Sequence, residues 1–418
     1  MLDKLSLNLY LFLTFLSLPF VKIIVIWRIY NAKEHPTRWR EKLGKPNLAR
    51  PSGKLIWLHA VGLGEVLALR GLIEELHKNK EELNFLVTSS TVLSADVFEK
   101  NSMPKTIHQF LPYDLRIYCK RFLRHWSPDF VIWSEQDIWP GMSSLVSKFG
   151  IKQVLVNGRM TKESFSRRNK IKPLHRVIYN DLEFISAQDL SSKKLYEKLG
   201  ASCTLRTDGS LKPHCPPLVF EEDKLKIIKK ATCNTKIWVL GSSHAEDEKI
   251  AIQTKKLLKD HKIKNLLVLI PRFPNRRKEI IKSLKNFKVR MQSKGEIPNQ
   301  KTEVYVVDSI GEIGLWYKAS KVVFIGGTFS SVEGHNPWEA INLDCTVIFG
   351  PRYSNFNDDF KLLERLNLAF QITSSKDLFE VLSRKNYVPI SKCLTKLKTK
   401  LEKDINILVK DILFLINN

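Results

Sequence analysis

The sequence lacks the cysteine and aromatic signatures of several protein classes. Its six cysteines are scattered along the chain and form no Cys-x-x-Cys pair. This spacing argues against a disulfide framework and a zinc site, and it fits a reducing compartment. We find no zinc finger and no aromatic signature of an RNA-binding domain, so nucleic acid is the least favoured partner.

Acidic residues are scarce relative to basic ones. The chain has 68 lysines and arginines against 43 aspartates and glutamates, which gives a net charge of +25. Such an excess favours an anionic lipid or a phosphorylated substrate as partner. Lysines spread over solvated surfaces would give the same count. With 418 residues and 43% hydrophobic content, the chain is long enough for two domains with real cores.

An uncharged apolar stretch lies near the N-terminus, at residues 7–21, and basic residues crowd its C-terminal side. No cleavage site of a secretory signal is evident. The stretch is marginal for spanning a membrane, which takes about 20 apolar residues. We therefore predict that residues 1–30 form a membrane-anchor helix. It either spans as a signal anchor, with the rest of the chain in the cytoplasm, or lies on the membrane surface. A helix buried in the core is the third alternative.

Residues 322–351 predict a strand, a glycine turn, a helix and a second strand. The helix start is well marked, because Asn336 is a favoured N-cap, Pro337 suits the first helical position and Glu339 follows three residues after the cap. A helix N-terminus beside a glycine turn suits a phosphate. An ordinary strand–helix–strand crossover without a ligand is the alternative.

A similar unit begins at residue 54. Residues 54–60 predict a strand, and 65–78 predict a helix with apolar residues on one face. Glu65 would then lie in the first helical turn, just beyond the carboxyl end of the strand, where open α/β sheets bind ligands. Alternatively, this carboxylate only complements the helix dipole.

Further strands are predicted to alternate with helices in the first half of the chain, at 84–88, 130–133, 153–156 and 184–187. This alternation is typical of a doubly wound α/β domain. Glu135 and Asp137 follow one of these strands, and Asn157 follows the next. Together with Glu65, they predict a polar cleft at one edge of the sheet. Alternatively, each is an ordinary polar residue of its loop.

The proline-rich segment 208–217 predicts the connection between domains, and it contains Lys212. Strand and helix patterns then resume, and residues 394–415 predict an amphipathic helix that could pack on either domain. We predict an α/β protein with two doubly wound, Rossmann-like domains. Its expected parts are a membrane anchor (1–30), a first domain (31–207), the connection (208–217), a second domain (218–385) and a C-terminal helix (386–418).

Six short motifs occur along the chain: HAVGLGE at 59–65, EQDIWP at 135–140, GSLK at 209–212, PR at 271–272, IGE at 310–312 and NPWE at 336–339. In their order and spacing they resemble the motifs of the 3-deoxy-D-manno-octulosonic acid (Kdo) transferases of lipopolysaccharide synthesis. These are inverting, two-domain glycosyltransferases of GT-B architecture. The resemblance covers nearly the whole chain.

The resemblance implies a role for each motif. Glu65 would be the general base, and Glu135 and Lys212 would stabilise the transition state. The donor CMP-Kdo would bind through its CMP moiety to Pro271, Arg272, Ile310, Gly311, Glu312, Asn336, Pro337, Trp338 and Glu339. The acceptor would be a lipid A precursor (lipid IVA) at the cytoplasmic face of the bacterial inner membrane.

No cofactor and no metal are expected, because the Asp-x-Asp motif of metal-dependent transferases is not found. Arg272, Lys212 and helix N-termini would then balance the charge of the leaving phosphate.

The chain departs from the family's pattern in several places. Gly62 replaces a serine, Asp137 shortens a glutamate and Glu333 replaces a glycine, while Phe273 and Asn275 replace a histidine and a glutamate. These departures concern contacts to the donor more than the reaction class. The alternatives are another GT-B lipid glycosyltransferase, a nucleotide-sugar epimerase, or a non-catalytic membrane-bound binding protein on the same scaffold.

Overall fold

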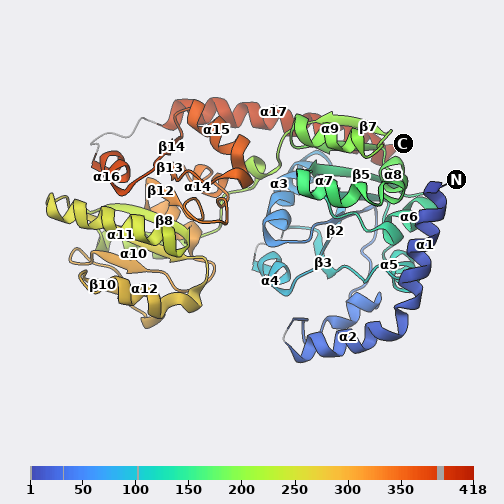
Figure 1. Ribbon diagram of the computed structural model, residues 1–418, viewed down its shortest axis with the longest axis horizontal. Coiled ribbons are helices and arrows are strands. Elements are labelled where there is room, and N and C mark those ends of the chain that lie inside the picture. Colours follow the sequence, from blue (N-terminus) through green and yellow to red (C-terminus); the bar gives the residue numbers. More distant parts are fainter. Residues whose placement is uncertain (1, 32, 101–102, 384–389) are drawn as a thin grey trace. The chain divides into compact units, whose positions relative to one another are not determined.

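The computed structural model describes residues 2–31, 33–100, 103–383 and 390–418 (Figure 1). The chain forms two compact units, the first made of residues 1–215 and 401–418 and the second of residues 216–400. The boundary at 215/216 falls inside the segment predicted as the connection. The last helix, α17 (Ile390–Asn417), ends in the first unit, whereas the sequence left its partner open. Its predicted start at residue 386 lies outside the described residues.

The first unit is built on a seven-stranded sheet in the order β3-β2-β1-β4-β5-β6-β7, with every neighbouring pair parallel. The five strands predicted here are confirmed. The sequence missed two edge strands, which are partly exposed and less apolar. The strands are β1 (Leu55–His59), β2 (Asn84–Ser89), β3 (Thr106–Phe110), β4 (Phe130–Ser134), β5 (Lys152–Gly158), β6 (Phe184–Ala187) and β7 (Thr204–Thr207).

Successive side chains of β1 enter two separate cores, because a strand alternates its faces. Trp57 packs with Trp133 on one face of the sheet, and Leu58 packs on the other with Leu69 of α3 and Val409 of α17. Helices therefore cover both faces, as a parallel sheet requires. They are α3 (Leu63–Asn79), α4 (Val92–Lys100), α5 (Arg116–Trp126), α6 (Pro140–Lys148), α7 (Lys162–Asn169), α8 (Lys172–Asn180), α9 (Leu190–Lys198) and the end of α17.

The second unit repeats this plan with a sheet in the order β10-β11-β9-β8-β12-β13-β14, again parallel throughout. The two strands predicted within residues 322–351 are confirmed as β12 and β13. The three-residue edge strands β10 and β14 were not predicted. The strands are β8 (Lys236–Ser243), β9 (Asn265–Pro271), β10 (Val289–Met291), β11 (Val304–Val306), β12 (Val322–Ile325), β13 (Thr346–Phe349) and β14 (Ala369–Gln371).

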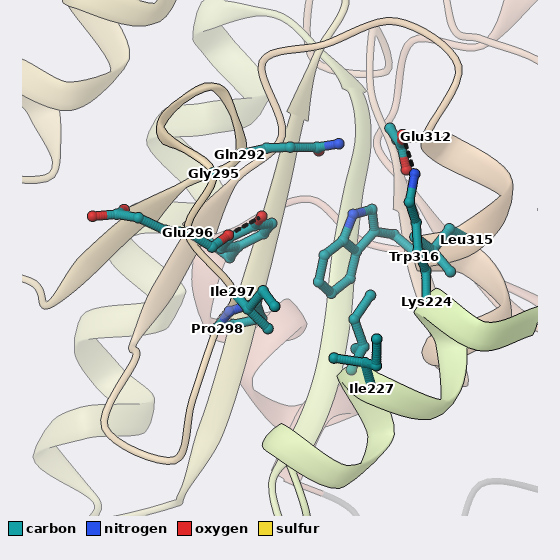
Figure 2. A pocket seen from close by; sticks show the side chains of 12 residues that line it. Lys224, Ile227, Gln292, Gly295, Glu296, Ile297, Pro298, Glu312, Leu315 and Trp316 are labelled. Carbon is teal, nitrogen blue, oxygen red and sulfur yellow. Dashed lines mark hydrogen bonds and ion pairs between the residues drawn. The ribbon is translucent and has the colours of Figure 1, made fainter. Parts of the chain in front are cut away.

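Helices flank this second sheet as well, and they are α10 (Glu222–Ala231), α11 (Ala245–Asp260), α12 (Arg277–Ser283), α13 (Ile313–Ala319), α14 (Trp338–Ile341), α15 (Asn357–Arg365) and α16 (Ser375–Ser383). Side chains from α10, α13 and the loop after β10 surround a pocket (Figure 2). Two doubly wound, Rossmann-like units confirm the predicted fold class.

The N-terminal segment forms two helices instead of the single helix predicted. α1 (Leu2–Leu16) and α2 (Leu18–Tyr30) are bent by 60° at a break beside Ser17. Pro19 stands in the first turn of α2, where its missing N–H is tolerated, and a proline there ends the preceding helix. Among the described residues no single helix meets the length and hydropathy expected of a membrane span. The bent pair meets them only when taken together.

One side of α1 packs against the first unit. Leu7 belongs to its core, the Tyr10 hydroxyl donates to Asp114 Oδ2 over 2.8 Å, and Asp3 pairs with Arg176 at 2.5 Å. Much of the remaining surface of the pair is apolar and exposed, at Leu2, Leu5, Leu9, Phe12, Leu13, Phe15, Leu16, Phe20, Ile23, Ile24, Ile26, Trp27 and Tyr30.

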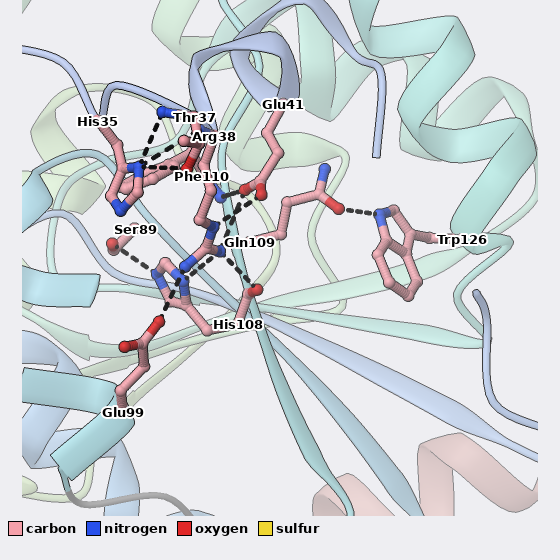
Figure 3. A network of polar contacts seen from close by, with 10 residues as sticks. All are labelled: His35, Thr37, Arg38, Glu41, Ser89, Glu99, His108, Gln109, Phe110 and Trp126. Carbon is pink, nitrogen blue, oxygen red and sulfur yellow. Dashed lines mark hydrogen bonds and ion pairs between the residues drawn. The ribbon is translucent and has the colours of Figure 1, made fainter. Parts of the chain in front are cut away.

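The segment after α2 contacts the edge strand β3 (Figure 3). Arg38 pairs with Glu41 at 2.8 Å and donates to the carbonyl of His108 over 2.9 Å. Glu41 Oε2 accepts from the backbone N–H of Phe110 over 2.8 Å. Two backbone groups on the unpaired side of the edge strand β3 are thus hydrogen-bonded by side chains of the same protein.

Candidate functional site

The general-base candidate of the first unit lies where β1 leads into α3. Glu65 is in the first turn of α3, as predicted, and its Oε2 accepts from the backbone N–H of Val61 over 2.8 Å. The pKa of Glu65 is raised to about 7, first by burial and then by the negative charge of Glu135, while the hydrogen bond from the Val61 N–H opposes the shift. A carboxyl with a pKa near neutral is well matched to general-base catalysis.

Glu135 directly follows β4 and adopts a left-handed backbone conformation with φ of +59°. This region is unfavourable for a side chain larger than glycine, and such strain is characteristic of functional sites. Its backbone N–H donates to the carbonyl of Val156 over 3.1 Å, and its Oε1 lies 3.8 Å from Lys212 Nζ. The structure therefore brings the predicted Glu65, Glu135 and Lys212 together at one end of the sheet.

Asn157 fixes the segment that carries Lys212. Its Oδ1 accepts from the backbone N–H of Leu211 over 3.0 Å and from Gln188 Nε2 over 2.7 Å. Asn157 has a left-handed φ of +55° and lies within β5, not after it as predicted, because the strand continues to Gly158. Asp137 also belongs to this group: burial raises its pKa, the charge of Arg168 lowers it, and Glu135 raises it.

Buried polar atoms without a hydrogen-bond partner gather at the same strand ends. Within the described residues they include His59 Nε2 and Ser134 Oγ, from the last positions of β1 and β4, and Asn157 Nδ2, from the last position but one of β5. Buried polar groups are nearly always paired with protein, water or ligand. This end of the sheet is therefore equipped to hold a polar ligand. Of these three residues, the sequence singled out Asn157 for the polar cleft and included His59 in the motif at 59–65, but it did not indicate Ser134.

The glycine turn of the second unit lies between β12 and the segment leading to α14. A Cβ on Gly326 would lie 2.3 Å from the carbonyl oxygen of Ser242, and Gly327 has a φ of +74°. Asp247 of α11 holds this turn, because its Oδ2 accepts from the backbone N–H of Gly327 over 2.7 Å and of His244 over 3.0 Å. The sequence identified the glycines but not this carboxylate.

The predicted helix start after Asn336 is present, but the helix has only four residues. Asn336 Oδ1 accepts from the backbone N–H of Trp338 over 3.1 Å, and Pro337 already has helical dihedral angles. So short a helix sums few peptide dipoles, which weakens the expected dipole attraction for a phosphate. The Trp338 side chain is buried, and its indole N–H donates to Asp359 over 2.7 Å.

Arg272 follows β9, which ends at Pro271, and its side chain is exposed. The pKa of Glu339 is raised to about 7 by burial, against the opposing effect of the charge of Arg272. The pKa of His335 is lowered to about 4, first by burial and then by the charges of His244 and Arg272. His335 Nε2 lies 3.0 Å from His244 Nε2. Arg272 and Glu339, both predicted to bind CMP, are therefore close together.

The predicted segment 310–312 lies between β11 and α13. Ile310 is exposed, Gly311 has a φ of +98° that suits glycine, and Glu312 lies 3.7 Å from Lys224 of α10 (Figure 2). Glu312 thus faces a pocket lined by α10 and α13. In the described part of the chain, no group of three or more histidines, cysteines, aspartates or glutamates is placed to hold a metal ion.

Two doubly wound units in one chain give the GT-B architecture that was predicted from the sequence. The family model described as 3-deoxy-D-manno-octulosonic-acid transferase (kdotransferase) matches residues 37–214. A 3-deoxy-D-manno-octulosonic acid transferase of Rickettsia bellii is 32% identical over 377 residues, 90% of each chain. That of Haemophilus influenzae is 28% identical over 354 residues, 82% of each chain. The chain belongs to the Kdo transferase family.

The fold is also similar to that of a solved UDP-GlcNAc 2-epimerase from Neisseria meningitidis. That structure matches with a TM-score of 0.54 and 14% identity, over 85% of this chain and 94% of the epimerase. At this identity the likeness concerns the fold alone.

Proposed function

We propose that the protein transfers Kdo from CMP-Kdo to a lipid A precursor, lipid IVA, with inversion and without a metal ion. The observation that carries this proposal is the partly buried Glu65, whose pKa is raised to about 7 beside Glu135 and near Lys212. A non-catalytic binding protein would have no need to keep an ionisable carboxyl in a partly buried position where ionisation is costly.

In the proposed step, Glu65 takes the proton of the acceptor hydroxyl. The hydroxyl oxygen forms a bond to the anomeric carbon of Kdo as the bond from that carbon to the CMP phosphate breaks, and CMP leaves with the electron pair. Such transition states have oxocarbenium character. The negative charge of Glu135 would stabilise the developing positive charge, and Lys212 and Arg272 would stabilise the departing phosphate.

The CMP moiety is assigned to the second unit. The exposed guanidinium of Arg272 can make charge-assisted hydrogen bonds to a phosphate. Glu339 lies close enough to feel the charge of Arg272. The positive φ of Gly311 supports the assignment of the turn at 310–312 as a second donor segment, and Pro271 and residues 336–339 complete the set.

We propose that α1 and α2 attach the protein to the cytoplasmic face of the bacterial inner membrane. A helix that packs on the first unit through Leu7 and Tyr10 cannot be surrounded by lipid, which favours attachment at the surface over spanning. The exposed apolar residues of the pair would enter the interface. The exposed Lys33 and Arg40 after α2 would meet anionic headgroups.

The reaction is tested by incubating the protein with CMP-Kdo, generated in situ, and tetraacylated lipid A precursor, followed by mass spectrometry of the lipid. We expect addition of Kdo by the wild-type protein and transfer slower by roughly two to four orders of magnitude in a Glu65→Gln variant. Conversion of UDP-GlcNAc instead, with no Kdo transfer, would favour the epimerase alternative. Protection from thermal unfolding by CMP but not by UMP would support the donor assignment independently.

Attachment is tested by flotation with vesicles that contain an anionic phospholipid. The double substitution Leu9→Asp and Phe12→Asp changes two α1 side chains that are each 57% exposed, and it should release the protein. The matched substitution Ile407→Asp changes a side chain of α17 that is also 57% exposed, and it should leave binding intact. Equal flotation of all three proteins would exclude α1 as the attachment site.

A further inference from the structure

A buried aspartate joins the N-terminal helix to the start of α6. Asp114 lies between β3 and α5 and is 7% exposed. Its Oδ2 accepts from the Tyr10 hydroxyl over 2.8 Å and from the backbone N–H of Gly141 over 2.7 Å. Its Oδ1 accepts from the backbone N–H of Met142 over 2.7 Å. A buried carboxylate is costly unless donors surround it, and the N–H groups of a first helical turn have no partner within the helix. Asp114 and the start of α6 therefore satisfy each other, and α1 supplies a further donor.

Gly141 shows how closely this carboxylate fits against α6. The residue lies in the first turn of α6, where alanine would favour the helix. Its φ is not positive, so the backbone conformation does not require glycine. A Cβ at this position would lie 2.8 Å from Asp114 Oδ1, which is closer than side chains normally approach. The space taken by the Asp114 carboxylate therefore explains the glycine.

The start of α6 is also the end of the turn that carries Glu135. Only residues 136–139 separate Glu135 from α6, and the backbone N–H of Glu135 donates to β5 over 3.1 Å. Ile138 of this turn belongs to the same core as Leu7 of α1, and α1 packs directly against α6 (Figure 1). The short turn is thus tied to β5 at one end and to Asp114 at the other. A displacement of α6 would be transmitted to Glu135.

We propose that Asp114 and Tyr10 are positioning residues for the transfer reaction, and this inference rests on the proposed function. Tyr10 of α1 orients the Asp114 carboxylate, which fixes the start of α6 and so keeps Glu135 beside Lys212. The helix that attaches the protein to the membrane by its outer side thus supports the catalytic turn by its inner side. Correct seating of α1 on the first unit becomes a condition for full activity.

Three substitutions in the full-length protein test this coupling through the kcat of Kdo transfer. In Asp114→Asn, either orientation of the amide places its NH₂ group against a backbone N–H of α6. We expect kcat to fall by roughly 100-fold, which is the cost of misplacing a catalytic group by about 1 Å. Gly141→Ala introduces a methyl group into the space of the carboxylate and should lower kcat in the same way. Tyr10→Phe removes only a hydroxyl and should lower kcat by roughly fivefold, the value of one typical hydrogen bond. CMP affinity should not change, because the residues assigned to CMP belong to the second unit.

Tyr113→Phe is the matched control. The Tyr113 hydroxyl also donates to a buried carboxylate, Glu34 Oε1, over 3.1 Å. That carboxylate pairs with Arg28 and Lys42 instead of with α6. Tyr113→Phe should therefore leave kcat unchanged, while thermal unfolding shows how far each tyrosine substitution destabilises the fold.

The pH profile of kcat/KM separates positioning from a loss of stability. Burial raises the pKa of Glu65, and the charges of Glu135 and Asp137 raise it further. Displacement of the turn should weaken this influence and move the acid limb to lower pH, whereas a loss of stability alone would leave the limb in place.

Unchanged kcat in Tyr10→Phe, or an equal loss in Tyr113→Phe with no movement of the acid limb, would overturn the coupling. The proposed function would stand in either case, because the wild type still transfers Kdo. Failure of the wild type to transfer Kdo would refute the proposed function and this inference with it.

Discussion

Replacing Glu65 with glutamine tests its role as a proton acceptor while keeping the size and hydrogen bonding of the side chain. The amide keeps the size of the side chain, and its oxygen can still accept from the backbone N–H of Val61, now 2.8 Å from Oε2. It cannot take a proton from the acceptor. Turnover should therefore fall by roughly two to four orders of magnitude, the usual contribution of general-base catalysis. CMP affinity should hardly change, because the residues assigned to CMP belong to the second unit.

The same substitution should stabilise the protein above neutral pH. The folded pKa of Glu65 is raised from 4.5 to about 7 by burial, so the folded state resists ionisation that the unfolded state accepts. The free energy of unfolding of the wild type should then decrease between about pH 5 and pH 8. That of Glu65→Gln should not show this decrease, because glutamine does not ionise. A shift of about 2.5 units at 1.36 kcal/mol per unit gives an upper limit of about 3 kcal/mol, and partial solvent access reduces it.

The measurement compares urea unfolding of the wild type and Glu65→Gln from pH 5 to pH 8.5, alongside the pH dependence of kcat/KM. The wild-type rate should fall below pH 7 as the base becomes protonated. Glu74→Gln is the matched control, because Glu74 lies on the same helix and burial also raises its pKa; it should keep full activity. The reasoning would be refuted by near wild-type transfer in Glu65→Gln, or by a stability difference that does not grow with pH.

Three further substitutions test particular contacts. Arg272→Ala should weaken CMP by roughly tenfold or more in calorimetry, because a charge-assisted contact to phosphate is lost; unchanged affinity would remove this arginine from the site. Gly62→Ser restores the residue typical of the family, and its Cβ would lie 3.7 Å from Glu65 Oε1. A hydroxyl there stabilises the carboxylate, so the acid limb of the rate profile should move to lower pH. Glu333 has a φ of +63° and pairs with Arg352 at 2.5 Å. Glu333→Ala should therefore destabilise the protein more than Glu333→Gly, by about 1 kcal/mol in urea unfolding.

The central strands were predictable because each is a short apolar run that ends at glycine or a polar motif. β1 and β12 are buried along their whole length, and such runs have few alternatives to a central strand. Edge strands have weaker signals: Arg206 of β7 and Gln371 of β14 are polar residues in short segments. Such segments form strands because they pair with a neighbouring strand, and the local sequence does not indicate this pairing.

The carboxylate site was partly predictable for a related reason. Glu65 and Glu135 follow neighbouring parallel strands, so their proximity follows from the fold class once the strands are known. The support around them was not predictable. Asn157 reaches Leu211 across 54 positions in the chain, and Asp247 reaches Gly327 across 80. Contacts of this kind depend on the folded backbone, and no local pattern indicates them.

The N-terminal segment shows why one apolar run admits several interpretations. Its composition fits a membrane helix, yet Tyr10 and the backbone N–H groups of Gly141 and Met142 all donate to the buried Asp114. Gly141 and Met142 begin α6, directly after the motif that contains Glu135. One side of α1 thus completes a polar network that fixes the start of α6, while the other side exposes leucines and phenylalanines. A periodic count of apolar residues cannot separate these two environments, because both sides of the helix contribute to the same hydrophobic run.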